Sequence, residues 1–120
     1  MDRKALGALG EKRAVEFLKK KKYRIRETNF RCREGEIDII AQDKDYLVFV
    51  EVRTRTGAAF GTPEESVTSA KKERLISAAL TYLQTHLNLP SLWRFDVVAI
   101  ETSPEGQLSR IELIQNAISG

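Results

Sequence analysis

The stretch GEIDIIAQDKDYLVFVEVRTR, residues 35–55, decides the fold. It holds two apolar runs rich in β-branched residues, 36–42 and 46–55, and each run has the length and composition of a strand. The three residues between the runs are Asp, Lys and Asp, which are typical of a turn. We therefore expect the two strands to pair as an antiparallel hairpin.

The second run begins apolar on both of its faces. Leu47 and Phe49 lie on one face and Val48 and Val50 on the other, because successive side chains of a strand alternate. A strand that is apolar on both faces is covered on both sides, as in the middle of an α/β sheet. We expect this strand to be the centre of the sheet.

Two proline-free segments with apolar residues at helical spacing flank the hairpin. Residues 3–22 predict a first helix, and the segment from residue 68 or 69 to residue 86 predicts a second. The apolar face expected for the second helix consists of Leu75, Ile76, Ala79, Leu80 and Leu83.

The remaining segments complete a mixed sheet. Residues 23–30 predict a strand near one edge, and residues 93–100 and 108–114 predict two more strands. A glycine-containing loop follows the hairpin, and Thr62 and Glu65 within and after it form a capping-box pattern. The expected order is helix, three strands, helix, strand, strand, in one α/β domain over residues 1–120, with the second helix as a crossover between parallel strands.

The composition excludes several classes of protein. The chain has 120 residues, 42% hydrophobic and 31% charged, which suits one compact domain. The one cysteine, Cys32, allows no internal disulfide, and with the one histidine, His86, it makes no Cys/His cluster for zinc. No run approaches the roughly 18 apolar residues of a membrane span, and the first residues lack the apolar core of a signal peptide. We expect a cytoplasmic protein with no membrane partner, in which any metal has oxygen ligands.

Two acids occupy strand positions where apolar residues are expected. Alternation along the first run of the hairpin places Ile37 and Ile39 on one face and Asp38 on the other. In the second run, Glu51 lies on the face of Phe49, midway along a strand that otherwise reads as buried. Charged side chains are rarely buried without a partner. Counting from the turn makes Glu51 a cross-strand or diagonal neighbour of Asp38, so we expect both carboxylates in one patch.

This patch has two interpretations. Two neighbouring carboxylates repel each other and raise a pKa unless a cation lies between them, and a divalent ion such as Mg²⁺ satisfies both. Alternatively, Arg53 or Arg55 neutralises Glu51, and Asp38 bonds to backbone amides, in a purely structural network. The residues alone leave both interpretations open.

Two further acids have less specific signals. Glu11 lies at the margin of the apolar stripe of the first helix, so it either points towards the sheet or is an ordinary exposed glutamate. Asp96 lies in a strand two residues after Arg94, and we interpret it as a structural partner of a basic group.

Basic residues are more informative by position than by number. The 20 Lys and Arg against 17 Asp and Glu give a net charge of +3, which only weakly suggests a polyanionic partner. The lysine run 19–22 is typical of a solvated helix end, where it complements the helix dipole. Lys71 and Lys72 fall in the first turn of the second helix, where cations are unfavourable. We expect an anionic neighbour there, either the acidic patch or a phosphate.

Three motifs together resemble a known family. GEIDIIA (35–41), FVEVRTR (49–55) and RFDVVAI (94–100) are similar to the YraN-like family of the PD-(D/E)XK nuclease superfamily and, more distantly, to archaeal Holliday junction resolvases. The similarity extends over nearly the whole chain, starting at GALGEKRAVEFL. It implies a restriction-endonuclease-like fold in which Asp38 and Glu51 bind Mg²⁺ or Mn²⁺ and Glu11 is the helical acid of the same site.

The resemblance also implies a function, with one departure. It implies a nuclease that hydrolyses phosphodiester bonds of branched or otherwise structured DNA, and Arg53 occupies the position of the superfamily's lysine. Arginine stabilises negative charge but is too basic to accept a proton. Either Lys71 supplies the missing ammonium group, or the chain binds nucleic acid without cutting it, or the nuclease scaffold serves protein interaction. A two-fold symmetric substrate would suit a homodimer. The residues expected to bind the nucleic-acid backbone are Arg31, Arg33, Arg55, Lys71 and Lys72.

Overall fold

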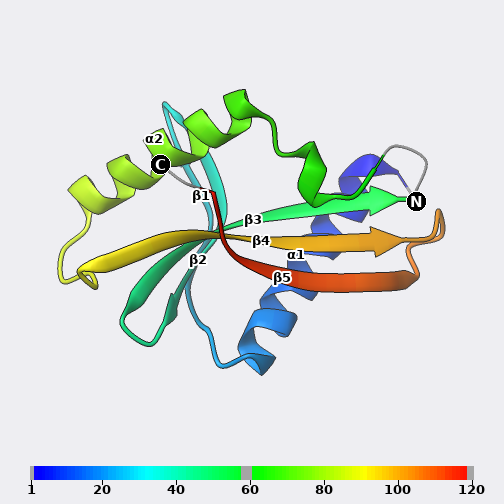
Figure 1. Cartoon of the computed structure of the whole chain (residues 1–120), viewed down its shortest axis with the longest axis horizontal. Coiled ribbons are helices and arrows are strands. Elements are labelled where there is room, and N and C mark those ends of the chain that lie inside the picture. The colour runs from blue at the N-terminus through cyan, green and yellow to red at the C-terminus, as the bar shows by residue number, and fades with distance from the viewer. Residues whose placement is uncertain (1, 58–60, 119–120) are drawn as a thin grey trace.

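The computed structural model describes residues 2–57 and 61–118, so part of the glycine-containing loop lies outside the described residues. Five strands form one sheet in the order β1-β2-β3-β4-β5, with two α-helices against it (Figure 1). This is the mixed α/β class expected from the sequence, with one short helix added between β3 and α2. The helices and strands are α1 (Arg3–Lys20), β1 (Arg24–Cys32), β2 (Gly35–Asp43), β3 (Tyr46–Thr56), the 3₁₀ helix η1 (Glu64–Ser66), α2 (Ser69–Thr85), β4 (Leu92–Thr102) and β5 (Leu108–Ile118).

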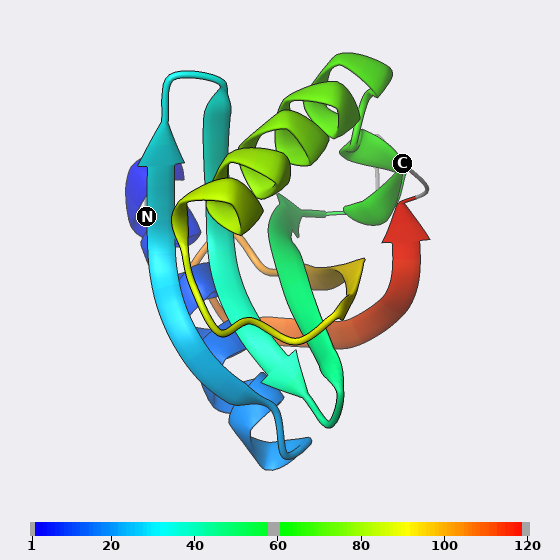
Figure 2. The ribbon, with the colours of Figure 1, turned by 90° about the vertical axis from the view of Figure 1, so that its left-hand side faces the viewer.

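The predicted hairpin and the predicted parallel pair are both present. β2 and β3 pair antiparallel, with Ile40 opposite Phe49, and β3 pairs parallel to β4, with Phe49 level with Phe95. β3 is therefore the central strand, as expected, and β1 is an edge strand (Figure 2). β5 continues to Ile118, four residues beyond the predicted end, and pairs antiparallel with β4.

Each face of the sheet has its own apolar core, because α1 covers one face and α2 the other (Figure 2). On the α1 side, Leu18 packs in one cluster with Val48. On the α2 side, Tyr82 packs in a second cluster with Phe49, and their rings meet edge to face. The alternation predicted along β3 is thus confirmed, and it explains why this strand is apolar on both faces.

The predicted apolar face of α2 is partly wrong. Leu75 and Ala79 are buried as expected, but Leu80 is 44% exposed. The helix instead buries Ala78 and Tyr82, which lie three and seven positions after Leu75 and so continue its stripe. A hydrophobic pattern does not identify Tyr82 as a core residue because its hydroxyl is polar, although its apolar ring supplies most of the contact area.

The strict alternation predicted for β2 is also wrong, and the break occurs at Asp38. Ile37 packs in the α2-side cluster and Ile39 in the α1-side cluster, although alternation places both on one face. Backbone pairing of β2 with β3 ends at Ile39 and Val50. One step further, the Asp38 carboxylate accepts a hydrogen bond from the Val52 backbone N–H, with an N–O distance of 2.8 Å. A side chain thus replaces the strand pairing, and the two strands separate at this point.

The N-terminal half of α1 lies close against β3. A β-carbon at Gly10 would overlap the Thr54 hydroxyl, so only glycine permits this approach. The Asp2 carboxylate caps the helix by accepting a hydrogen bond from the Ala5 N–H. The close approach of Gly10 to Thr54 brings Glu11, the next residue of the helix, beside the point where β2 and β3 separate. No helix among the described residues is both long and apolar enough to span a membrane.

Candidate active site

The separation of β2 and β3 opens a hollow of about 570 Å³ between α1, the sheet and the start of α2. Its lining is unusually rich in charge. The acidic residues that line it are Glu11, Glu36, Asp38 and Glu51, and the basic residues are Arg3, Arg53, Arg55 and Lys71. Four of the residues assigned to one site from the sequence, Glu11, Asp38, Glu51 and Arg53, are therefore brought together.

Asp38 is fixed by the backbone of the neighbouring strand. Its Oδ2 atom accepts the hydrogen bond from the Val52 N–H described above. The register of β2 and β3, extended by one step beyond Ile39 and Val50, places Asp38 opposite Glu51. The predicted cross-strand relation of these two acids is confirmed.

Glu51 is the most constrained acid of the hollow. Its side chain is only 2% exposed, and its Oε2 atom lies 3.3 Å from Lys71 Nζ and 3.5 Å from Arg53 Nη1. Both distances exceed the roughly 2.7–2.9 Å of a strong charge-assisted hydrogen bond. Burial, followed by the charge of Asp38 and a hydrogen bond to it, raises the pKa of Glu51 to about 8, against the opposing effect of the two cations.

Arg53 is held from the side away from Glu51. Its Nε donates to Ser66 Oγ, at 2.8 Å, and Ser66 belongs to the short helix η1. The capping box predicted for this helix is only half formed. The Glu65 carboxylate accepts hydrogen bonds from both the N–H and the hydroxyl of Thr62, but the N-cap residue is Pro63 and no side chain caps the helix. The guanidinium group is thus tied to η1 by one nitrogen while another faces the acidic pair.

Lys71 reaches the hollow from the first turn of α2. The Thr68 hydroxyl caps this helix by accepting a hydrogen bond from the Lys71 N–H. The Lys71 ammonium then meets Glu51, so the predicted anionic neighbour exists and is the acidic patch. Lys72 is exposed and lines no part of the hollow.

Glu11 completes the acidic lining from α1. Partial burial, and then the negative charge of Asp38, raise its pKa, while a hydrogen bond with Asn29 opposes the rise. Of the two alternatives that the sequence left open for Glu11, the structure therefore supports the one in which its side chain points towards the sheet. Within residues 2–57 and 61–118, however, no three His, Cys, Asp or Glu side chains converge closely enough to hold an ion together. Asp38 acts on Glu51 through both its charge and a hydrogen bond, but on Glu11 through its charge alone.

The residues expected to bind a nucleic-acid backbone divide into two groups. Arg55 and Lys71 line the hollow, whereas Arg31 on edge strand β1 and Arg33 in the turn after this strand are not among its lining residues. Arg31 forms an ion pair with Glu36, at 3.3 Å and largely in solvent, so it lies next to the mouth. Sequence reasoning missed Arg3 and Asn29, and the only available signal was an asparagine in a strand, where this residue is uncommon.

A second buried acid, Asp96 on β4, has a different environment. Its Oδ1 accepts hydrogen bonds from Arg94 Nε at 3.0 Å and from the Asn116 N–H at 2.9 Å. Its Oδ2 accepts one from the Tyr23 hydroxyl at 2.9 Å. Arg94 also reaches Asp43, at 2.9 Å. The expectation that Asp96 pairs with Arg94 is confirmed.

The donor set of the hollow suits a hard divalent cation. Mg²⁺ and Mn²⁺ prefer carboxylate oxygens, and Mg²⁺ commonly uses only one or two of them, together with water and substrate phosphates. Burial, and then the charge of the neighbouring Asp38 carboxylate, raise the pKa of Glu51. A cation between the two would remove that repulsion, so the residues present fit such an ion.

Comparison with known proteins matches the chain to one family over most of its length. A family model described as "Uncharacterised protein family UPF0102" matches residues 10–100, which include every residue of the acidic lining. A UPF0102 protein of Symbiobacterium thermophilum is 53% identical over 112 residues, covering 93% of this chain and 94% of that protein. Another, from Geobacter metallireducens, is 49% identical over 114 residues, covering 95% and 92%.

Proposed function

The chain belongs to the UPF0102 family, as its resemblance to YraN-like proteins implied, and we propose that it is a metal-dependent nuclease that hydrolyses phosphodiester bonds in structured DNA. The observation that carries this proposal is the pair of carboxylates Asp38 and Glu51. They lie side by side in a charged hollow, next to the point where the pairing of β2 with β3 ends. Perturbed acids gathered in a concave site are typical of catalytic centres. The restriction-endonuclease-like fold implied by the resemblance is part of the same proposal.

Asp38 and Glu51 would hold the ion, Mg²⁺ or Mn²⁺. The chemistry that such an ion supplies is polarisation of the scissile phosphate and a lower pKa for a bound water. In the hydrolysis, one phosphorus–oxygen bond forms to water and the bond to the leaving sugar oxygen breaks. The protein's own contribution is to bring two carboxylates and the cations Arg53 and Lys71 together in one hollow.

Arg53 and Lys71 divide the work of the single lysine found elsewhere in the superfamily. Arg53, tied to Ser66, is positioned to stabilise the negative charge that develops on the phosphate. Lys71 carries the ammonium group, and its Nζ lies 3.3 Å from Glu51. An ammonium group can give a proton to the leaving sugar oxygen, which the more basic guanidinium cannot do. We therefore assign proton handling to Lys71, delivered from α2 rather than from the strand.

The neighbouring cations would hold the substrate. Arg55 and Arg3 line the hollow, and Arg31, Arg33 and Lys72 lie around it on exposed positions. Contacts of this kind bind the sugar-phosphate backbone and give salt-sensitive affinity with little reading of base sequence. We therefore expect the protein to select its substrate by shape rather than by base sequence.

Cleavage of a panel of labelled DNA tests the proposal. Duplex, flap, four-way junction and single-stranded substrates are incubated with Mg²⁺, Mn²⁺ or EDTA and with wild type, Asp38→Ala or Glu51→Ala. Glu105→Ala, an exposed acid in the turn between β4 and β5, is the matched control. We expect metal-dependent cutting by wild type and Glu105→Ala, lost in the other two while their circular dichroism stays native. No cutting of any substrate by wild type would overturn the proposal.

One observation favours a second function. Glu51 already has two cations within 4 Å, Arg53 and Lys71, which can neutralise it without a metal. On this basis the chain would bind nucleic acid without cutting it. In that case Asp38→Ala would leave DNA binding intact, and wild type would bind salt-sensitively but show no cleavage with either metal.

A further inference from the structure

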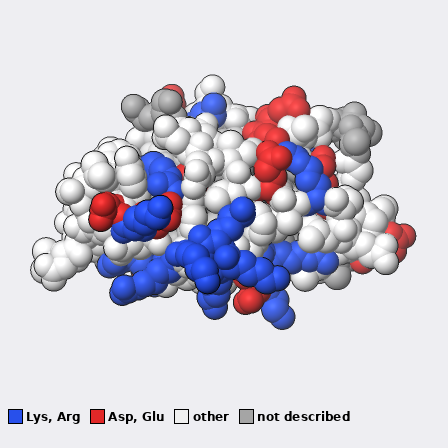
Figure 3. All heavy atoms as spheres, turned by 60° about the horizontal axis from the view of Figure 1, so that its bottom comes forward, with Lys and Arg blue, Asp and Glu red and all other residues white. Residues whose placement is uncertain are grey.

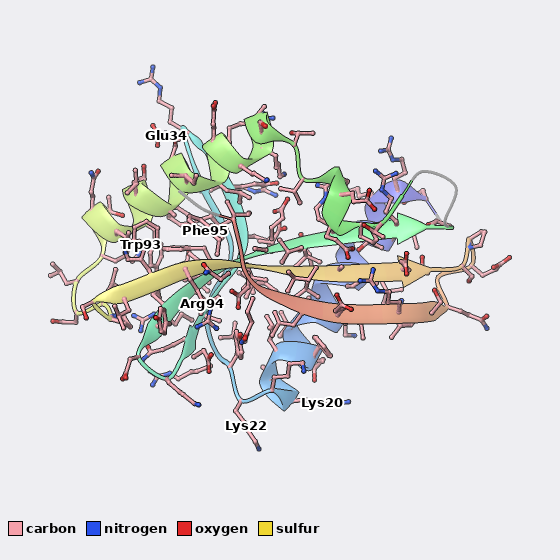
Figure 4. All side chains as sticks on the ribbon, viewed as in Figure 1. Lys20, Lys22, Glu34, Trp93, Arg94 and Phe95 are labelled. Carbon is pink, nitrogen blue, oxygen red and sulfur yellow. The ribbon has the colours of Figure 1, made fainter. Side chains whose placement is uncertain are left out.

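Basic side chains without acidic partners gather at one end of the molecule, far from the hollow. Figure 3 shows a broad field of Lys and Arg on the side that is the underside of Figure 1. Figure 4 shows Lys20 and Lys22 extending from the lower end of α1 into solvent. We call these residues the basic end surface, and all of them are exposed. They are Lys19, Lys20, Lys21, Lys22, Arg24 and Arg26.

The basic end surface concentrates basic side chains without ion-pair partners in one short segment of the chain. Among the described residues, none of its six side chains has an Asp or Glu within ion-pair distance, although Arg26 donates to Gln42 Oε1. Arg53, Arg94 and Arg110, in contrast, each contact one or more acids. Six unneutralised charges within eight consecutive residues create a positive potential that attracts a polyanion.

The end of α1 keeps a lysine where the backbone favours glycine. Lys22 has a φ of 70°, and the Tyr23 N–H bonds to the Leu18 carbonyl to close the helix. Glycine is the usual residue at this left-handed position, and another residue there costs roughly 1 kcal/mol. The local conformation therefore does not favour lysine at this position.

A hollow of about 650 Å³ lies beside this end of α1. Among the described residues that line it, Asp43 is the one acid, and its carboxylate accepts a hydrogen bond from Arg94 at 2.9 Å. The other lining residues are Lys21, Lys22, Lys44, Tyr23, Gln115 and Leu113.

Edge strand β1 connects this surface to the mouth of the acidic hollow. β1 begins at Arg24 in the basic end surface and ends at Cys32, paired with Gly35, next to Glu36 in the lining of the hollow. Nine residues of strand span about 30 Å. This is the rise of roughly nine base pairs of duplex, at about 3.4 Å each. Figure 2 shows β1 running along an open edge of the sheet.

We infer that a duplex arm of the substrate runs along β1 from the acidic hollow to the basic end surface, which anchors its backbone about nine base pairs from the scissile phosphate. This inference rests on the proposed function for the identity of the polyanion as nucleic acid. It adds that affinity depends on substrate length. Short duplexes engage only the hollow, and longer duplexes engage both surfaces.

Binding of two hairpin duplexes tests the inference. One has a stem of about five base pairs and the other a stem of about fifteen, shorter and longer than the distance along β1. Fluorescence anisotropy in EDTA measures affinity without cleavage, for wild type and for the variant K20Q/K21Q/K22N, in which asparagine suits the left-handed position 22. The control variant, K20R/K21R/K22R, keeps all three charges.

The neutral variant should bind the long hairpin about tenfold more weakly, with a salt slope lower by about 0.9 for each lysine lost. It should bind the short hairpin as wild type does, and the arginine variant should match wild type with both. Equal losses for both hairpins, or no loss for either, would overturn the inference. So would normal DNA binding combined with lost sedimentation on phosphatidylserine vesicles, which would assign the surface to anionic lipid.

Adding Mn²⁺ to the same samples separates this inference from the proposed function. Length-dependent binding without any cleavage would leave the anchoring surface standing and reject the nuclease. Cleavage of both hairpins, with the neutral variant binding and cutting both as wild type does, would leave the nuclease standing and reject the anchoring surface.

Discussion

Two acids, Glu51 on β3 and Asp96 on β4, lie on neighbouring strands and are both almost fully buried, yet their surroundings are opposite. Asp96 receives three hydrogen bonds of 2.9–3.0 Å, from Tyr23, Arg94 and the backbone of Asn116. Glu51 has only two longer cationic contacts, at 3.3 and 3.5 Å, and a second carboxylate beside it.

The difference separates a structural acid from a candidate catalytic one. A buried carboxylate that is fully hydrogen-bonded has little affinity left for a ligand and mainly holds its partners in place. A buried carboxylate beside another carboxylate is repelled by it, and a bound cation removes this repulsion. Asp96 is hydrogen-bonded to Tyr23, which follows α1, and to Asn116 on β5, whereas Glu51 lines an open hollow.

The largest expected effect on stability is at the structural acid. Asp96→Ala leaves the Arg94 guanidinium and the Tyr23 hydroxyl without their shared partner, and should lower the free energy of unfolding by about 3–5 kcal/mol. Urea denaturation measures it. Asp38→Ala, beside the open hollow, should cost clearly less, and an equal or larger loss for Asp38→Ala would remove the distinction between the two acids.

Removal of the ammonium group tests the incomplete site. Lys71→Ala should slow cleavage about 10- to 100-fold, because a cation and proton donor beside Glu51 is lost. The neighbouring Lys72→Ala, which removes an equal charge outside the hollow, should slow it only about twofold through weaker backbone binding. Single-turnover rates at saturating enzyme separate chemistry from binding. Equal effects of the two variants would contradict the assignment.

The raised pKa of Glu51 predicts a dependence of stability on pH. Its pKa is about 8 in the folded chain against an ordinary 4.5, so the folded state holds the proton more tightly than the unfolded state. This contribution to stability is complete below about pH 4.5 and is lost as pH rises through about 8.

Glu51→Gln removes this titration and leaves a neutral side chain of similar shape. Without metal, the variant should gain stability relative to wild type as the pH rises from about 4.5 to about 8, by about 1.4 kcal/mol for each unit by which the pKa of Glu51 is raised. Thermal unfolding in EDTA across the pH range measures the gain. Parallel curves for the two proteins would mean that Glu51 titrates normally.

The smallest effect is expected at the helix that supplies Lys71. Thr68→Ala removes the hydroxyl that caps α2, and should cost about 1 kcal/mol of stability. Thr68→Ser should restore it. Thr68→Ala should also lower the cleavage rate slightly, because the first turn of α2 frays without its cap. A stability loss with no change in rate would show that Lys71 does not need the cap.

The sheet could be predicted from the sequence because its signals are local. The hairpin 35–55 has apolar runs on both sides of a turn, and these fixed both the central strand and the parallel crossover to β4. The face of α2 was predicted less well, since Leu80 is exposed and Tyr82 buried. Hydrophobicity alone does not record that an aromatic ring with a polar tip can fill a core.

The candidate site was predictable in its acids and not in its shape. Asp38 and Glu51 stood out as charges on apolar strands, and counting from the turn was enough to pair them. The break of alternation at Asp38 was not predictable, because it arises when a side chain takes a hydrogen bond from the partner strand. Nor does linear sequence indicate that Arg3 and Asn29 face the same site, since α1 meets β1 only in the folded chain.

Binding of Mn²⁺ to the metal-free protein tests the central claim most directly, because it does not depend on finding the right substrate. Electron paramagnetic resonance counts free and bound Mn²⁺ for wild type, Asp38→Asn, Glu51→Gln and the control Glu105→Gln. We expect wild type and the control to bind one ion per chain in competition with Mg²⁺, and the Asp38 and Glu51 variants to lose this binding while remaining folded. Wild type that binds no ion, or variants that bind it unchanged, would contradict the claim that the two carboxylates form a metal site.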